Sequence, residues 1–325
     1  MDYYSIELCA GAGGQALGLE KAGFKHVELI EIDSNACNTL RFNRPHWNVI
    51  EGDICKYSPK LAVEIDLLAG GVPCPPFSIA GKQLGSNDER DLFPEALRLV
   101  TELKPKAVML ENVRGLLDSI FDEYRNDLIQ TLVRLGYNAE WRLLNASDYG
   151  VSQLRPRVIF VAIRKDIAPY FFWPNPFDKN PLAVGELLYD LMAKNKWKGA
   201  VQWRKNACDI APTIVGGSKK HGGPDLGPTR ARKAWATLGV DGKGIAYDSP
   251  ERDYEGMPRL TNEMVARIQG FPADWIFTGS KTSKYRQIGN AFPPPVAEAV
   301  GSQIRNALEM YNTFVKHIIP ERKLA

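Results

Sequence analysis

The sequence predicts an α/β protein with a Rossmann-like, mostly parallel sheet, helices on both faces, and a second, smaller irregular domain. Strand-like and helix-like segments alternate through the first half of the chain, as in parallel sheets whose strands are joined by helices. The first strand-like segment runs directly into a glycine loop, 11-GAGG-14. Between about residues 172 and 256 the periodicity weakens, and glycine, proline and charged residues become frequent. We therefore expect a large domain over 1–175, an inserted domain over 176–284, and a C-terminal segment, 285–325, that packs back on the first.

The individual elements follow from apolar periodicity and from helix caps. Strands are expected at 3–8, 26–32, 65–70, 107–111, 138–144 and 158–163, which are short segments of apolar residues, in some cases interspersed with polar ones. Helices are expected at 15–22, 92–103, 119–135 and 295–308, where apolar residues recur at helical spacing. A further helix should begin after Asp33 or Ser34, and a short one after Thr261, because these side chains can cap a helix N-terminus.

The composition is that of a globular protein and argues against several classes of function. The chain has 325 residues, of which 44% are hydrophobic and 24% charged, and its net charge is +3. No apolar run approaches the roughly 20 residues that a membrane helix needs. The five cysteines are far apart without a CxxC pair, and the four histidines are scattered. This pattern fits a reducing, cytoplasmic compartment and argues against disulfides, a metal site and histidine-based triads.

Three features of the first half of the chain predict an adenosine-binding site. The loop 11-GAGG-14 lies between a strand and a helix, where glycines let the backbone approach a ligand closely. Glu31 ends the second strand 20 residues after Gly11, close to the usual spacing for a carboxylate that binds ribose hydroxyls. Asp53, in 52-GDI-54, ends a further expected strand, the third along the chain, and is placed to accept a hydrogen bond from an adenine amino group. These features leave open whether the ligand is NAD or S-adenosylmethionine.

Cys74 lies in a proline-rich loop, 72-VPCPPFS-78, directly after the fourth expected strand. This loop opens at the carboxyl edge of the sheet, where ligands bind in such folds. A cysteine is often only a small buried apolar residue. Here the flanking prolines fix the backbone, which favours a preorganised nucleophile.

Glu111 and Asn112 end the next strand, at the same edge of the sheet. Partial burial would raise the pKa of Glu111 and let it hold and give a proton near neutral pH. The simpler interpretation is an ion pair between Glu111 and a nearby arginine such as Arg114.

The segment 153-QLRPR-157 places a glutamine and two arginines at alternate positions. In an extended chain Gln153, Arg155 and Arg157 point the same way. Two guanidiniums on one face suit phosphates or a carbonyl oxygen, and a solvated face is the alternative.

Taken in order, these pieces resemble the cytosine-5 DNA methyltransferases, and the likeness covers most of the chain. The segment 7-ELCAGAGG-14 resembles the cofactor loop of that family, and 73-PCPPFS-78 resembles its catalytic loop. Further matches are 88-DERDLF-93, 111-ENV-113, the Gln-x-Arg-x-Arg segment, 259-RLTNEMVARIQGFPADW-275 and 285-YRQIGNAFPPPVAEAV-300.

The resemblance implies transfer of a methyl group from S-adenosylmethionine to carbon 5 of a cytosine flipped out of a specific double-stranded DNA sequence. Cys74 would add to ring carbon 6 while Glu111 gives or shares a proton with ring nitrogen 3, and Arg157 would hold the cytosine carbonyl oxygen or a nearby phosphate. The implied catalytic residues are Cys74, Glu111, Arg157, Arg155, Gln153 and Asn112. The implied cofactor residues are Cys9, Ala10, Gly11, Gly13, Gly14, Glu31, Ile32, Asp53, Ile54, Leu92 and Asn290.

Three positions depart from the family pattern. The first motif usually begins Asp-Leu-Phe, but this chain has Glu7-Leu8-Cys9, so the aromatic that normally lies against the cofactor is missing. Pro75 replaces the glutamine that often follows the catalytic cysteine, and Ile32 replaces an aromatic that many relatives place against adenine. None of these changes removes a catalytic group, but the first leaves open how the cofactor is held.

The inserted domain occupies the position of the target-recognition region of the family. Its segment 213–235 is basic and rich in glycine, which suits close approach to a DNA backbone. The residues expected to bind DNA are Lys219, Lys220, Arg230, Arg232 and Lys233, together with Ser78 of the catalytic loop. The compact length indicates a bacterial restriction-modification enzyme, with a possible partner endonuclease that acts on the same site.

Other classes of function are less favoured. An RNA cytosine-5 methyltransferase would share this chemistry, but the Cys-Phe-Thr signature of the tRNA-directed relatives is absent from the insert. A non-catalytic DNA-binding protein on the same scaffold is disfavoured because Cys74, Glu111 and Arg157 are all present. An NAD dehydrogenase is disfavoured because no histidine or lysine is placed for hydride transfer.

Overall fold

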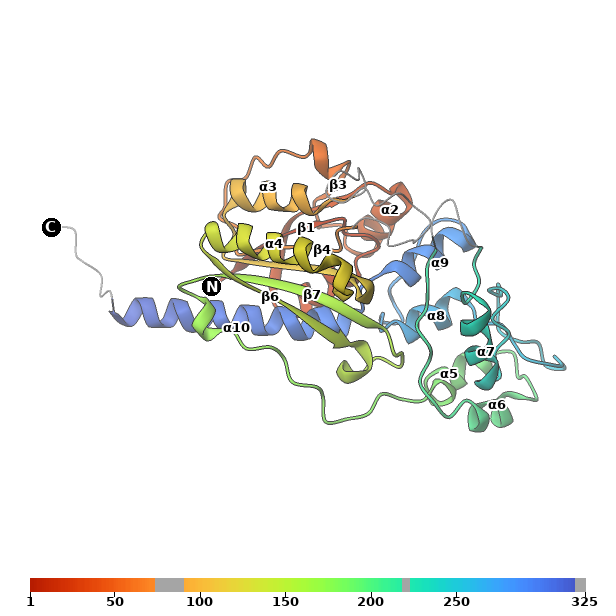
Figure 1. Cartoon of the computed structure of the whole chain (residues 1–325). Helices are drawn as coiled ribbons and strands as arrows, with labels where there is room; N and C mark the ends of the chain where they lie inside the picture. The colour runs from red at the N-terminus through yellow and green to blue at the C-terminus, as the bar shows by residue number, and fades with distance from the viewer. Residues whose placement is uncertain (74–90, 218–222, 319–325) are drawn as a thin grey trace.

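The computed structural model describes residues 1–73, 91–217 and 223–318, and its centre is a seven-stranded sheet (Figure 1). The strand order is β3-β2-β1-β4-β5-β7-β6. The strands are β1 (Tyr3–Leu8), β2 (Phe24–Glu31), β3 (Val49–Glu51), β4 (Leu67–Gly70), β5 (Ala107–Val113), β6 (Tyr137–Asn145) and β7 (Pro156–Arg164). Strands β1 to β5 pair in parallel, and β7 runs antiparallel to both β5 and β6. The predicted Rossmann-like, mostly parallel sheet is therefore confirmed.

Apolar side chains alternate between the two faces of the sheet, and each face is covered by its own helices. Leu68 and Val108 belong to the apolar cluster under α3 (Phe93–Leu103) and α4 (Asp122–Arg134). Their strand neighbours Ala69 and Met109 belong to the cluster under α1 (Gly14–Lys21) and α10 (Pro294–Ile318). Figure 1 shows α10 on the side of the sheet opposite α3 and α4. The last helix of the chain thus packs on the first one, where Gly18 leaves no room for a side chain because a Cβ would lie 2.4 Å from the Pro294 carbonyl oxygen.

The strand order reverses between β1 and β4, so the loops that follow these two strands meet at one edge of the sheet. β1 leads into the glycine loop and α1, and β4 leads into residues 71–73. At the same edge β2 leads into α2 (Ser34–Asn43). The predicted cap of α2 is confirmed, because the Asp33 carboxylate accepts hydrogen bonds from the N–H groups of Asn35 and Ala36. Such a reversal opens a crevice at the carboxyl ends of the strands, which is where open α/β sheets bind ligands.

Beyond residue 176 the chain forms a group of short helices beside the sheet (Figure 1). They are α5 (Val184–Met192), α6 (Ala200–Asn206), α7 (Thr229–Thr237), α8 (Asn262–Ile268) and α9 (Lys281–Asn290). Trp203 and Trp235 are buried among them, in a cluster that continues to Leu17 and Leu40 of the sheet domain. The Thr261 cap of α8 is confirmed, whereas α5, α6, α7 and α9 were not predicted, because helices this short show few periods of apolar spacing. In the described ranges, no helix has both the length and the apolar content that crossing a membrane requires.

Candidate active site

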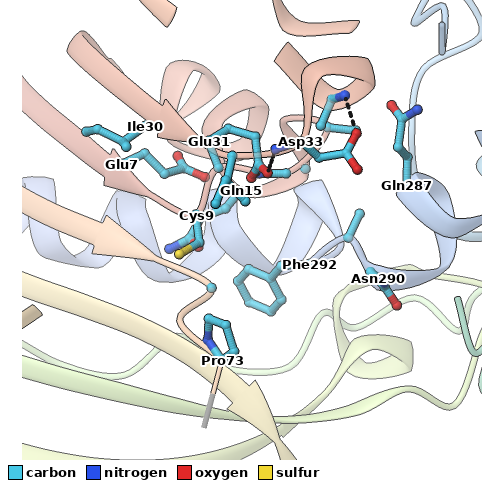
Figure 2. Close-up of a pocket in the computed structure, with 18 of the residues that line it drawn as sticks. Glu7, Cys9, Gln15, Ile30, Glu31, Asp33, Pro73, Gln287, Asn290 and Phe292 are labelled. Atoms are coloured by element: carbon cyan, nitrogen blue, oxygen red, sulfur yellow. Dashed lines mark hydrogen bonds between the residues drawn. The ribbon is translucent and has the colours of Figure 1, made fainter. Parts of the chain in front are cut away.

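A cavity of about 330 Å³ opens at the carboxyl ends of β1, β2 and β4 (Figure 2). Small-molecule sites typically measure about 300–1,000 Å³. All but one of the residues expected to hold a cofactor line it: Cys9, Ala10, Gly11, Gly14, Glu31, Ile32, Asp53, Ile54, Leu92 and Asn290. Glu111, expected to be catalytic, lines the same space. Among the residues that the structure describes, no group of three or more His, Cys, Asp and Glu is arranged to hold a metal ion.

Glu31 holds the glycine loop in place. One carboxylate oxygen accepts the Gly11 N–H at 2.7 Å, and the other accepts the Asp33 N–H at 2.7 Å. Gly11 has a φ of +55°, a left-handed conformation that glycine adopts without strain. Burial raises the pKa of Glu31, and the two N–H donors act against that rise. Because a carboxylate oxygen can accept more than one hydrogen bond, Glu31 can fix the loop and still accept from ribose hydroxyls.

Gly13 is the expected cofactor residue that does not line the cavity. It is the N-cap of α1, with a φ of +88°. A Cβ at this position would lie 2.7 Å from Leu40 Cδ2 and 2.8 Å from Trp275 Cζ2. Close packing of α1 against α2 and Trp275 therefore accounts for this glycine.

Two buried acceptors at the cavity have no hydrogen-bond partner among the described residues. They are Glu7 Oε2 and Gln15 Oε1. Both residues line the cavity and are buried, and burial raises the pKa of Glu7 well above its ordinary value. An unpartnered buried polar group is rare because it costs about 1–3 kcal/mol. These two acceptors therefore indicate a ligand that donates hydrogen bonds or carries positive charge at this wall.

The chain that leads into Cys74 is fixed by two hydrogen bonds. Cys74 itself lies outside the described residues. Asn112 Nδ2 donates to the Val72 carbonyl oxygen at 2.9 Å, and the Leu92 N–H donates to the Pro73 carbonyl oxygen at 3.1 Å. Pro73, the residue bonded to Cys74, lines the cavity. Asn112, at the end of β5, therefore fixes the chain just before Cys74.

Glu111 forms its ion pair with Arg157 on the neighbouring strand β7. Arg157 Nε lies 2.7 Å from Glu111 Oε1, and both side chains are almost fully buried. Arg114, the partner suggested by the sequence, is exposed, so the pairing follows the strand register instead of the local sequence. Burial raises the pKa of Glu111, while Arg157 and then Arg155 act against that rise. A carboxyl group with a raised pKa is suited to give a proton near neutral pH.

Gln153 and Arg155 form buried hydrogen bonds with segments that are distant in the sequence. Arg155 is fully buried and donates to the carbonyl oxygens of Ile214, Gly289 and Ala291, each at 2.8 Å. Gln153 Oε1 accepts the Ile214 N–H at 2.7 Å. The prediction that the guanidiniums of Arg155 and Arg157 face a ligand together is therefore wrong, because the Arg155 guanidinium donates its hydrogen bonds to backbone carbonyl oxygens. Arg155 instead positions the segment before α10 that borders the cavity.

α9 and the turn after it also contribute to the cavity, which was not predicted from the sequence. Arg286, Gln287 and Phe292 line the cavity together with the predicted Asn290. Figure 2 shows the Phe292 ring pointing into it. The match of 285–300 to the last motif of the family was the available signal, but only its asparagine was assigned to the cofactor.

Three of the residues expected to contact DNA lie on α7. Arg230 and Lys233 are exposed and Arg232 is half-buried. Trp235, on the same helix, is fully buried and fixes the helix to the protein. The other expected DNA contacts, Ser78, Lys219 and Lys220, lie outside the described residues.

Known proteins match the chain over nearly its whole length. The family model C-5 cytosine-specific DNA methylase matches residues 3–306. The Type II methyltransferase M.NgoMIV of Neisseria gonorrhoeae is 58% identical over 315 residues, which cover 96% of this chain and 100% of the relative. The Type II methyltransferase M.NaeI of Lentzea aerocolonigenes is 60% identical over 311 residues, which cover 94% of this chain and 75% of the relative.

Solved structures agree with this fold. A Spodoptera frugiperda DNMT2 has a TM-score of 0.64 at 18% identity and covers 94% of this chain and 100% of its own. The S. pombe Dnmt2 methyltransferase has a TM-score of 0.63 at 16% identity and covers 95% of this chain and 99% of its own. At such low identity these two support the fold alone, whereas the family match and the two close relatives establish the family. The chain belongs to the C-5 cytosine-specific DNA methylases and is a DNA cytosine-5-methyltransferase.

Proposed function

We propose that this enzyme transfers the methyl group of S-adenosylmethionine to carbon 5 of a cytosine in a specific double-stranded DNA sequence, through a covalent bond to Cys74. We choose this cofactor because two buried oxygens at the cavity have no hydrogen-bond partner among the described residues, Glu7 Oε2 and Gln15 Oε1. S-adenosylmethionine has an ammonium group that can donate hydrogen bonds to these oxygens, and its positive charge would act against the raised pKa of Glu7 and favour the carboxylate. NAD would bring a pyrophosphate, whose negative charge would disfavour ionisation of the buried Glu7 and Glu31 carboxyl groups still further.

The adenosine part would lie along the ends of β2 and β3. Glu31 accepts from the ribose hydroxyls. Asp53 uses one oxygen to accept the Cys55 N–H at 3.0 Å, and its second oxygen can accept from the adenine amino group. Ile32 and Ile54 supply apolar contact with the adenine ring. When bound, the cofactor would supply an electrophilic methyl group at the end of the cavity near Glu111. Its methionine part would lie close to Ala10, Gly11 and Gly14. The pocket would be closed by Cys9, Leu92 and Asn290.

The chemical step would be shared between Cys74 and Glu111. The Cys74 thiolate adds to ring carbon 6, and Glu111 gives its proton to ring nitrogen 3, so that the ring accepts the electron pair. Carbon 5 becomes electron-rich and would form the bond to the methyl carbon as the bond from that carbon to the sulfonium sulfur breaks, so that S-adenosylhomocysteine is the leaving group. A base then removes the carbon 5 proton, the bond from carbon 6 to sulfur breaks, and Glu111 recovers its proton. Arg157, beside Glu111, would hold the cytosine carbonyl oxygen.

The three parts of the chain would divide the work. Residues 1–175 carry catalysis and most of the cofactor site, 176–284 recognise DNA, and 285–325 complete the cofactor pocket. Arg230, Arg232 and Lys233 on α7, with Lys219, Lys220 and Ser78, would contact the DNA. Because the two close relatives are named Type II methyltransferases, we further propose a cognate restriction endonuclease that cuts the same site in the cytoplasm.

Bisulfite sequencing of plasmid DNA from cells that produce the protein tests the substrate, with Cys74→Ala as the matched control. We expect protected cytosines in one short repeated context in the wild type and none in the control. The same plasmid should resist an endonuclease that cuts this context. Methylated RNA together with unprotected plasmid DNA would contradict the proposed substrate.

A further inference from the structure

Cys9 forms part of the cavity wall with an unusual backbone. Its φ of +51° is left-handed, which is uncommon for a residue that has a side chain. Burial and then the nearby Glu31 raise the pKa of its thiol, so Cys9 is neutral at ordinary pH and acts as a small apolar group. In the resembling family an aromatic residue usually occupies this position. The small Cys9 side chain therefore leaves space beside the glycine loop, where an aromatic ring in other members of the family would contact the cofactor.

Phe292 supplies an aromatic ring to the same cavity from the other end of the chain. It lies in the turn between α9 and α10, and Figure 2 shows its ring between Cys9 and Asn290, with Pro73 nearby. Of the described residues that line the cavity, Phe292 alone is aromatic. Any aromatic contact that the described wall makes with the cofactor must therefore come from Phe292.

The backbone around Phe292 is held rigidly. The preceding Ala291 carbonyl oxygen accepts from Arg155 Nη2 at 2.8 Å and from Gln269 Nε2 at 2.7 Å. On the other side, a Cβ on Gly14 would lie 2.2 Å from the Phe292 carbonyl oxygen, so α1 and this turn touch through their backbones. The backbone that carries the ring is thus fixed before the cofactor arrives, and little backbone entropy is lost on binding.

The position of the ring selects the part of the cofactor that it contacts. The adenosine end is assigned to Glu31 and Asp53, after β2 and β3. Phe292 instead lies toward Pro73, which leads into Cys74, and so toward the methyl-transfer end. The group of S-adenosylmethionine at that end is the sulfonium, and an aromatic face attracts a cation.

We propose that Phe292 is the aromatic wall of the cofactor pocket, that it replaces the ring missing at Cys9, and that it lies against the sulfonium. This inference rests on the proposed use of S-adenosylmethionine. It makes Phe292 a residue that distinguishes the charged methyl donor from its neutral product, S-adenosylhomocysteine, which has a thioether in place of the sulfonium.

Isothermal titration of the full chain with S-adenosylmethionine and with S-adenosylhomocysteine tests it. Phe292→Leu should weaken binding of the methyl donor about 3- to 30-fold and binding of the product clearly less. Phe24→Leu is the matched control, because Phe24 is equally buried in the same apolar cluster but does not line the cavity. It should leave both affinities unchanged. An exchange variant, Cys9→Phe with Phe292→Val, should recover donor affinity relative to Phe292→Val alone.

The outcomes separate this inference from the proposed function. Wild-type protein that binds neither ligand would overturn both. Wild-type binding with unchanged donor affinity in folded Phe292→Leu would overturn the role of Phe292 and leave the cofactor assignment intact. Equal weakening of donor and product would overturn the contact with the sulfonium.

Discussion

Cys74→Ser is expected to abolish methyl transfer, with kcat at least about 10⁴-fold lower, while cofactor and DNA still bind. Serine has nearly the size of cysteine, but its hydroxyl is not ionised near neutral pH and is a far weaker nucleophile toward carbon 6. The hydrogen bonds that fix the loop, from Asn112 to Val72 and from Leu92 to Pro73, involve no atom of this side chain. The loss should therefore fall on the chemical step.

Transfer of a labelled methyl group to duplex DNA measures this loss, and equilibrium binding of the two ligands shows that the variant is folded. Cys208→Ser is the matched control, because Cys208 is an exposed thiol outside the cavity lining. It should turn over at the wild-type rate. Normal turnover by Cys74→Ser would exclude the covalent mechanism.

Glu111→Gln should lower kcat by about 10²- to 10⁴-fold, the usual contribution of a general acid. The amide keeps the shape of the side chain but cannot give a proton to ring nitrogen 3. The change also removes the carboxylate beside Arg157, whose Nε lies 2.7 Å from it in a buried pair. The thermal unfolding temperature of the variant should therefore be measured together with kcat, so that a loss of stability is distinguished from a loss of catalytic rate.

The pH dependence of kcat separates the two groups that we propose to be catalytic. Burial raises the pKa of Glu111, so the wild-type rate should fall as the pH rises past that raised pKa and the group loses the proton it must give. On the acidic side the rate should fall as Cys74 loses its thiolate. The profile of Glu111→Gln should keep the acidic limb and lose the basic one. A basic limb that survives unchanged in this variant would assign the proton donor to another group.

The fold was predictable from the sequence because its signals are local. The glycine loop, the apolar strands and the Asp33 cap each depend on a few neighbouring residues, and the structure forms them where the pattern indicates. The four short helices α5, α6, α7 and α9 were missed. Two of them are held by buried tryptophans, Trp203 and Trp235, whose packing partners lie elsewhere in the chain.

Within the site, most residues named by a motif line the cavity, whereas the partners that depend on pairing across the fold were not predicted. Glu31 and Asp53 were predicted to line the cavity because each follows or ends a strand at the same edge of the sheet. The pairing of Glu111 with Arg157 in place of Arg114 depends on the antiparallel register of β5 and β7. The three carbonyl partners of Arg155 are separated from it by 59 to 136 positions, which no local pattern reveals.

The proposed bond between the Cys74 sulfur and carbon 6 of the target cytosine is tested most directly by a duplex that carries 5-fluorocytosine at the methylated position. Addition and methylation can proceed on this base, but fluorine cannot leave as a cation, so the adduct should persist. After incubation with S-adenosylmethionine and proteolysis, mass spectrometry should find the nucleotide on Cys74 in the wild type and nothing in Cys74→Ser. Methyl transfer to ordinary duplex without a trapped adduct, or an adduct on another residue, would contradict the mechanism.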